Sequence, residues 1–112
     1  MPSYIVKPDR VRDFYVLWST IVDAPTAFGT RAELTAEADL GPQAAERFAR
    51  ADEFGSSCRV GETAPWYGWD YKAIIYNQQG ILRRHRLRAV CELLRVGDAA
   101  GVKLLLDQFK EE

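Results

Sequence analysis

The stretch DFYVLWSTIVDAPTAFGTRAE, residues 13–33, decides the fold, because it predicts a strand, a proline stop and the start of a helix. Residues 14–22 alternate between two sides, and β-branched and aromatic residues fill both of them. An edge strand with one side in water would show cleaner polar alternation, so this strand is expected in the interior of a small sheet. Pro25 ends it, because proline cannot donate a hydrogen bond to a neighbouring strand. The two predicted faces carry Phe14, Val16, Trp18, Thr20 and Val22 on one side and Tyr15, Leu17, Ser19 and Ile21 on the other.

Two helices are expected after this strand. Thr30 and Glu33 have the spacing of a capping box, in which each side chain binds the other residue's backbone N–H. The first helix is expected to end near Leu40, before a glycine–proline pair, and the second to run to about Phe54. Gly55 then ends the second helix, since glycine readily takes the left-handed conformation that closes helices.

The two ends of the chain are expected to add a strand and two helices. Tyr4–Lys7 predicts a short strand that pairs antiparallel with the central one. Residues 71–77 predict a third strand or the beginning of a helix. A helix from about Arg83 to Gly97 is followed by a helix that Asp98 caps, and this short joint predicts an antiparallel αα-hairpin. Apolar residues at helical spacing are Leu87, Val90, Cys91 and Leu94 in the first of these helices and Val102, Leu105, Leu106 and Phe109 in the second.

Length and composition predict one globular domain over residues 1–112. Its expected class is α+β, with a small antiparallel sheet of two or three strands packed against three or four helices. Fifteen basic and sixteen acidic residues nearly cancel, so the overall charge supports neither nucleic-acid nor anionic-membrane binding. Cys58 and Cys91 are expected to be reduced thiols, as is typical of a cytoplasm. The sequence has no secretory signal and no apolar run of about 20 residues, so a cytoplasmic location without a membrane partner is expected.

Three segments of the chain resemble small accessory (orphan) proteins carried by actinobacterial phages. These are RDFYVLWSTIVDAPTAFGTRAEL at residues 12–34, FARADEFGSS at 48–57, and RHRLRAVCELLRVGDAAGVKLLLDQF at 84–109. The resemblance covers most of the chain, but its motifs are not catalytic signatures and carry over no site residues. It implies an accessory protein in a bacterial cytoplasm that interacts with, or inhibits, a host or phage protein.

An aromatic cluster falls in a segment without periodicity, residues 55–70. Aromatic residues on an irregular loop are typical anchors for a protein partner. The alternative is that the rings pin a long loop onto the sheet, each burying about 150–250 Å². The residues in question are Trp66, Tyr67, Trp69 and Tyr71. A second expected contact surface is the other sheet face, through Tyr15, Leu17 and Ile21, which would bind a partner or form a homodimer.

A basic cluster opens the penultimate helix. Arg84, Arg88 and Arg95 share one stripe of a helix and so predict a phosphate-contacting surface, which is the nucleic-acid alternative. Against it, Glu92 lies four residues from Arg88 in ion-pair position, as on an ordinary solvated face. Arg83 projects instead towards the apolar side. We expect it to pair with Asp70, with Asp23 or with terminal carbonyls, because an unpaired charge there would be costly.

Catalytic and metal sites find little support. His85 is the single histidine, and six helical residues place it on a different side from Cys91. A metal site of Cys58, His85 and Cys91 fails for the same reason and lacks a fourth ligand. No cofactor motif is present. The sequence therefore favours a non-enzymatic protein that binds a protein partner, with nucleic-acid binding as the first alternative and a small enzyme as the second.

Overall fold

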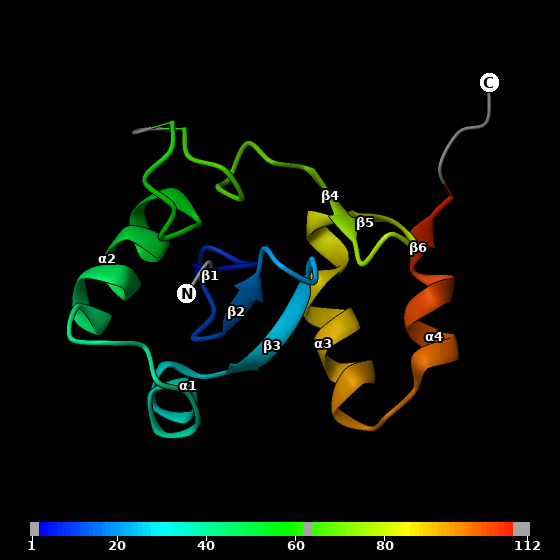
Figure 1. The fold of residues 1–112 in the computed structure, drawn as a ribbon, viewed down its shortest axis with the longest axis horizontal. Coiled ribbons are helices and arrows are strands. Elements are labelled where there is room, and N and C mark those ends of the chain that lie inside the picture. Colours follow the sequence, from blue (N-terminus) through cyan, green and yellow to red (C-terminus); the bar gives the residue numbers. More distant parts are fainter. Residues whose placement is uncertain (1–2, 62–63, 109–112) are drawn as a thin grey trace.

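The chain forms two three-stranded antiparallel sheets with four α-helices, which confirms the α+β class (Figure 1). The structure is a computed structural model and describes residues 3–61 and 64–108. The sequence predicted a single sheet. A second sheet forms because the three strands after residue 70 pair with one another instead of joining the first sheet.

The first sheet has the order β1-β2-β3, with β1 at Ser3–Val6, β2 at Tyr15–Ser19 and β3 at Ala24–Gly29. The interior position of β2 and its antiparallel pairing with β1 confirm two predictions. Its predicted length is wrong, because the strand ends at Ser19 and residues 20–23 form a turn.

Pro25 does not stop a strand; it lies within one. β3 is an edge strand, where a missing N–H has no partner to lose. The pairing with β2 also shifts register between Leu17 and Trp18, which accommodates the irregularity. The predicted proline stop was therefore a turn followed by a third strand.

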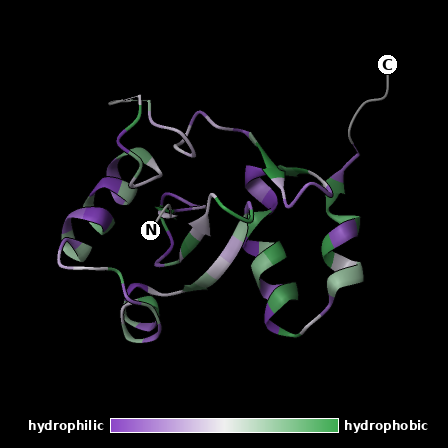
Figure 2. Ribbon diagram, in the orientation of Figure 1, coloured by the Kyte–Doolittle hydropathy of each residue, from purple (hydrophilic) through white to green (hydrophobic). Residues whose placement is uncertain are grey.

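The first sheet is covered on both faces (Figure 1). Val16 and Trp18 face a core shared with the second sheet and α3, residues Leu87–Arg95. Tyr15 faces the opposite side, where α1 (Arg31–Glu37) and α2 (Ala44–Phe54) cover it and leave it 4% exposed. Figure 2 shows β4 and much of α3 in hydrophobic green, as the shared core requires.

The predicted second sheet face is consequently not open for a partner or a homodimer. Tyr15 is buried and Leu17 is half-buried beside the helices that cover this face. Ile21, predicted to belong to the same face, lies in the turn after β2 and is 71% exposed. The correction has a simple cause, because the helices from residues 31 to 54 cover the side that was expected to be bare.

The helix signals behave largely as predicted. The Thr30 hydroxyl accepts from the Glu33 N–H at 3.2 Å, and the Thr30 N–H donates to the Glu33 carboxylate at 3.0 Å, which confirms the capping box. α1 ends at Glu37, earlier than the expected Leu40. α2 ends at Phe54, and Gly55 follows with a φ of 87°, as a left-handed helix stop requires.

The second sheet has the order β4-β5-β6. β4 at Ala73–Tyr76 confirms the strand alternative for this segment. β5 at Gly80–Arg83 was not predicted from the sequence. The hairpin is closed by Asn77 and Gln78, which both take positive φ angles, so this segment is a tight turn between two strands.

The C-terminal segment departs most from expectation. A 3₁₀ turn at Arg84–Arg86 precedes α3, which starts at Leu87, later than the expected Arg83. Asp98 caps α4 (Ala99–Leu104) by accepting from the Gly101 N–H, as predicted. The helix then stops early, because Leu106 and Asp107 form β6 against β5. The predicted apolar position Phe109 lies outside the described residues.

Within the described ranges, no helix has both the length and the apolar character needed to cross a bilayer.

Candidate functional site

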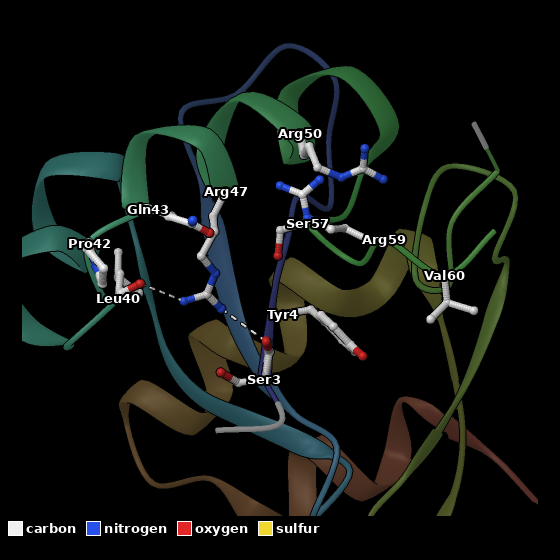
Figure 3. Close-up of a pocket in the computed structure, with 10 residues that line it drawn as sticks. All are labelled: Ser3, Tyr4, Leu40, Pro42, Gln43, Arg47, Arg50, Ser57, Arg59 and Val60. Carbon is white, nitrogen blue, oxygen red and sulfur yellow. Dashed lines mark hydrogen bonds between the residues drawn. The ribbon is translucent and has the colours of Figure 1, made fainter. Parts of the chain in front are cut away.

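Three surface hollows among the described residues are large enough to hold a ligand or part of a partner. The first, here called the arginine hollow, measures about 410 Å³ and lies between the N-terminal strand and α2 (Figure 3). Its arginines serve the fold. Arg47 donates to the carbonyls of Leu40 and Ser3 at 2.9 and 3.1 Å, and Arg50 donates to the Cys58 carbonyl at 2.8 Å. Arg59 pairs with the Glu46 carboxylate, so few donors point to a ligand.

The second hollow, here called the aromatic hollow, brings together the predicted loop and the new strand β4. It measures about 320 Å³. Three of its lining residues are large apolar side chains open to solvent: Trp66 is 49%, Tyr71 36% and Ile75 55% exposed. The full lining is Asp23, Trp66, Tyr67, Tyr71, Ala73, Ile74 and Ile75.

Of the four predicted aromatic residues, two hold the loop on the fold and two keep exposed surface. Tyr67 packs on the core, with its ring centroid 6.1 Å from that of Trp18 and 5.8 Å from that of Tyr4. Trp69 donates its indole N–H to the Glu53 carbonyl at 2.9 Å and so fastens the loop to the end of α2. Trp66 and Tyr71 keep exposed surface in the aromatic hollow.

The outer edge of β4 forms one wall of the aromatic hollow. The Arg84 N–H donates to the Lys72 carbonyl at 2.8 Å, so this facing pair is hydrogen-bonded. Bonded and non-bonded pairs alternate along an antiparallel ladder. Ala73 and Ile75 therefore direct their N–H and C=O groups away from β5, and no strand in the described part of the chain pairs with them.

The outer edges of the first sheet are less open. The outer edge of β1 is covered by the segment after Gly55, where the Ser57 N–H donates to the Ile5 carbonyl at 2.9 Å. β3 carries Pro25, which removes a donor from its edge. The β4 edge has neither protection.

Asp23 closes one end of the aromatic hollow. Its carbonyl accepts from the Asn77 N–H at 2.8 Å, which joins the turn after β2 to the end of β4. Burial raises the pKa of Tyr67, and the negative charge of the nearby Asp23 carboxylate raises it further. No ion pair among residues 3–61 and 64–108 involves this carboxylate, although it sits at the rim of an otherwise uncharged lining.

Sequence reasoning missed four residues that line this hollow: Asp23, Ala73, Ile74 and Ile75. Asp23 was considered only as a partner for Arg83. The exposed positions of β4 could have been noticed, because Ala73 and Ile75 alternate with the buried Ile74. That this edge faces the aromatic loop depends on the packing of two sheets, which no local pattern contains.

The predicted arginine stripe does not form a common surface. Arg84 is buried, with 5% exposure, and lies in the 3₁₀ turn before α3, where its guanidinium binds backbone carbonyls. Arg88 pairs with Glu92 at 2.9 Å, as the i,i+4 spacing predicted. The Arg95 guanidinium lies 5.3 Å from the Phe28 ring centre. The helix that would align the three side chains starts only at Leu87, which is why Arg84 leaves the stripe.

Arg83 and Arg84 exchange the roles expected of them. Arg83 lies at the end of β5, is exposed, and pairs with Asp107 at 2.6 Å, so the predicted partners Asp70 and Asp23 are wrong. The hydrogen bond from Arg83 keeps the pKa of Asp107 below its ordinary value. The buried cation is Arg84, because strand alternation in β5 turns residue 83 outwards.

The histidine and the two cysteines, the remaining candidates for a catalytic or metal site, lie in different environments. His85 is exposed, whereas Cys58 and Cys91 are both buried and free. Among the described residues, no group of three or more histidine, cysteine, aspartate or glutamate side chains could hold a metal ion.

We expect both thiols to be unreactive in the folded protein. Burial raises the pKa of Cys91 to about 12, so its reactive thiolate is nearly absent near neutral pH. The test is titration with a disulfide reagent under native and denaturing conditions. Negligible reaction with the native protein and two reactive thiols in denaturant are expected, and native reaction of Cys91 at the rate of free cysteine would contradict the buried placement.

No protein-family model, curated protein or solved structure matches the chain. Inferences about function therefore rest on its side chains and their geometry.

Proposed function

We propose that this chain is a non-enzymatic accessory protein that binds an extended segment of a partner protein in the aromatic hollow. The observation that carries the proposal is the convergence of exposed Trp66, Tyr71 and Ile75 on one hollow beside an unpaired strand edge. Exposed apolar residues that gather in one place mark interaction surfaces, and tryptophan and tyrosine are the commonest energetic anchors.

Strand addition is the binding mode that this geometry favours. The outward N–H and C=O groups of Ala73 and Ile75 offer main-chain hydrogen bonds to an added strand. Trp66 and Tyr71 then receive alternate side chains of the partner. An extended peptide fits this wall better than a helix does, because a helix satisfies its own backbone groups and would leave the β4 edge unpaired.

The charge of the hollow indicates which side chain the partner segment should carry. Asp23 is the one acidic residue of the lining, and aromatic rings surround the hollow that it borders. A carboxylate beside aromatic faces favours a cation, since the face of an indole or phenol ring attracts ammonium and guanidinium groups. The bound segment should therefore carry a lysine or arginine flanked by residues that tolerate an extended conformation.

The phage context and the cytoplasmic location predicted from the sequence belong to this proposal. A small phage-encoded protein could bind a host or phage protein by adding one of its strands to the β4 edge. It would modulate that partner without catalysing a reaction. Nucleic-acid binding through Arg84, Arg88 and Arg95 is less well supported, because Arg84 is buried.

The test is selection of a random linear-peptide library on the folded protein. The substitutions Trp66→Ala and Tyr71→Ala together should weaken selected peptides by at least about tenfold, as loss of two aromatic anchors predicts. The matched control is Val96→Ala with Leu104→Ala, which removes two exposed apolar side chains elsewhere and should leave affinity unchanged. Equal binding by both double variants, or selection of no peptide, would refute the proposal.

Two refinements test the binding mode and the charge. N-methylation of the peptide backbone at alternate positions should abolish binding in one register and spare it in the other, as strand addition requires. Asp23→Asn should weaken a peptide that carries the selected lysine or arginine and leave its alanine-substituted version unaffected. If methylation has no effect, the partner binds by side chains alone.

A further inference from the structure

A third hollow, here called the basic hollow, lies apart from the aromatic one and measures about 530 Å³. The loop between β1 and β2 forms one side of it through Arg10, and the segment from Arg83 to His85 forms another. Trp69 and Lys72 complete it between them. Three stretches distant in sequence thus place basic side chains around one space.

The basic hollow holds positive charge that its own carboxylates do not neutralise. Asp9, its acidic lining residue, pairs with Arg12 at 3.3 Å, and Arg83 pairs with Asp107. No carboxylate in the described part of the chain pairs with Arg10, Lys72 or Arg84. The basic hollow therefore carries an excess of positive charge, although the whole chain carries a net charge of −1.

Trp69 holds two of these cations close together. The Arg10 guanidinium carbon lies 4.4 Å and that of Arg84 5.1 Å from the indole ring centre. Burial lowers the pKa of Arg84 to about 10, and the charge of Arg10 contributes to the shift. The Nε donor of Arg84 is buried without a hydrogen-bond partner among the described residues. A bound anion would relieve this repulsion.

We propose that the basic hollow binds a phosphate group, either as the free ion or as the phosphomonoester of a small molecule. Phosphate suits the donors present, because guanidinium groups bind its oxygens in pairs and an ammonium adds a point charge. Arg10 and Lys72 are the exposed donors that would contact it directly. Arg84 would attract the phosphate through its positive charge without contacting it, since its Nη groups donate to backbone carbonyls.

A single phosphate group fits better than a nucleic-acid strand. The unpaired cations converge on one hollow, whereas a strand would need basic groups spaced along a surface. The neighbouring basic residues that could extend such a track are paired, Arg83 with Asp107 and Arg12 with Asp9. This inference concerns a different surface from the aromatic hollow and stands whether or not a peptide binds there.

The test is titration of the labelled protein with inorganic phosphate, followed by amide and indole N–H resonances at constant ionic strength. Saturable shifts at Trp69 and Lys72 are expected, with a response to glycerol phosphate if the site accepts monoesters and to phosphate alone if it takes the free ion. Arg10→Ala with Lys72→Ala should weaken binding about a hundredfold, as the loss of two charged donors implies.

The control variant is Arg88→Ala with Lys103→Ala, which removes the same net charge from the surface of α3 and α4. It should bind phosphate as the unchanged protein does. Equal weakening by both double variants would mean that phosphate responds only to overall charge, and absence of saturable shifts would mean that the hollow binds no phosphate. Either result overturns the proposal.

Discussion

Replacing Arg84 with methionine is expected to destabilise the protein more than any exposed arginine substitution, by about 3 kcal/mol. The Arg84 guanidinium donates to the carbonyls of Lys7, Gly55 and Tyr67. These residues follow β1, follow α2 and lie in the aromatic loop, respectively. One side chain thus fastens three separate segments to the start of α3.

The expected destabilisation by Arg84→Met is the difference between two opposing effects. Methionine fills a similar volume but removes the Arg84 donor from the carbonyls of Lys7 and Tyr67, and each unmet group costs about 1–3 kcal/mol. The Gly55 carbonyl still accepts from the Lys7 N–H at 2.9 Å. Removing the buried charge also removes its desolvation cost, the main cause of the lowered Arg84 pKa, and this offsets part of the loss. The cost of the unmet carbonyls is expected to exceed the gain from removing one buried charge, so the net result is destabilisation.

The measurement is urea unfolding of the purified variants. Arg88→Ala is the control, because Arg88 makes an exposed i,i+4 pair with Glu92 that is worth at most about 0.5 kcal/mol. Arg84→Lys should be nearly as harmful as methionine, since an ammonium cannot reproduce the planar fork that reaches three carbonyls. An Arg84→Met midpoint equal to that of Arg88→Ala would show that the carbonyls of Lys7 and Tyr67 find other donors.

The contrast between Arg83 and Arg84 explains how far local patterns predict this fold. The strand around Val16, the capping box at Thr30 and the helix stop at Gly55 depend on neighbours within a few residues, and each was found from sequence. The buried arginine was assigned one residue too early. A helix was assumed from Arg83, whereas a strand and a 3₁₀ turn occupy that segment, and the side-chain direction changes with the backbone.

The candidate site was predictable only in its aromatic half. Trp66 and Tyr71 were found because aromatic residues in an aperiodic segment are conspicuous. Which rings pin the loop depends on Trp18 and Glu53, residues far away along the chain. The β4 edge exists because residues 80–83 form an unpredicted strand that pairs with the other side of β4. Such pairings between distant segments are set by tertiary packing and not by local propensity.

Gly55→Ala is expected to lower the free energy of unfolding by about 3 kcal/mol, an effect similar to that of Arg84→Met. Gly55 has a φ of 87°, where a residue with a Cβ is disfavoured by about 1–2 kcal/mol. A Cβ there would also lie 2.8 Å from the Trp69 backbone nitrogen and 2.9 Å from an Arg84 Nη atom. Both approaches are closer than packed atoms tolerate, so the loop must move away from α2.

The chain supplies a control that separates these two costs. Gly97 has a φ of 74° and Gly41 a φ of 80°, and a Cβ at either position would meet nothing within 4 Å. Gly97→Ala and Gly41→Ala should therefore cost only the backbone term of about 1 kcal/mol. The excess for Gly55→Ala, measured by thermal and urea unfolding, reports the close approach of Trp69 and Arg84.

Combining Gly55→Ala with Arg84→Met tests whether the two residues stabilise one junction. Once the Arg84 guanidinium is gone, an added Cβ at Gly55 loses one of its clashes, and the Gly55 carbonyl has already lost its arginine donor. The double variant should be less destabilised than the sum of the single variants, because residues in contact share their losses. Strict additivity would mean that Gly55 and Arg84 stabilise the protein independently of each other.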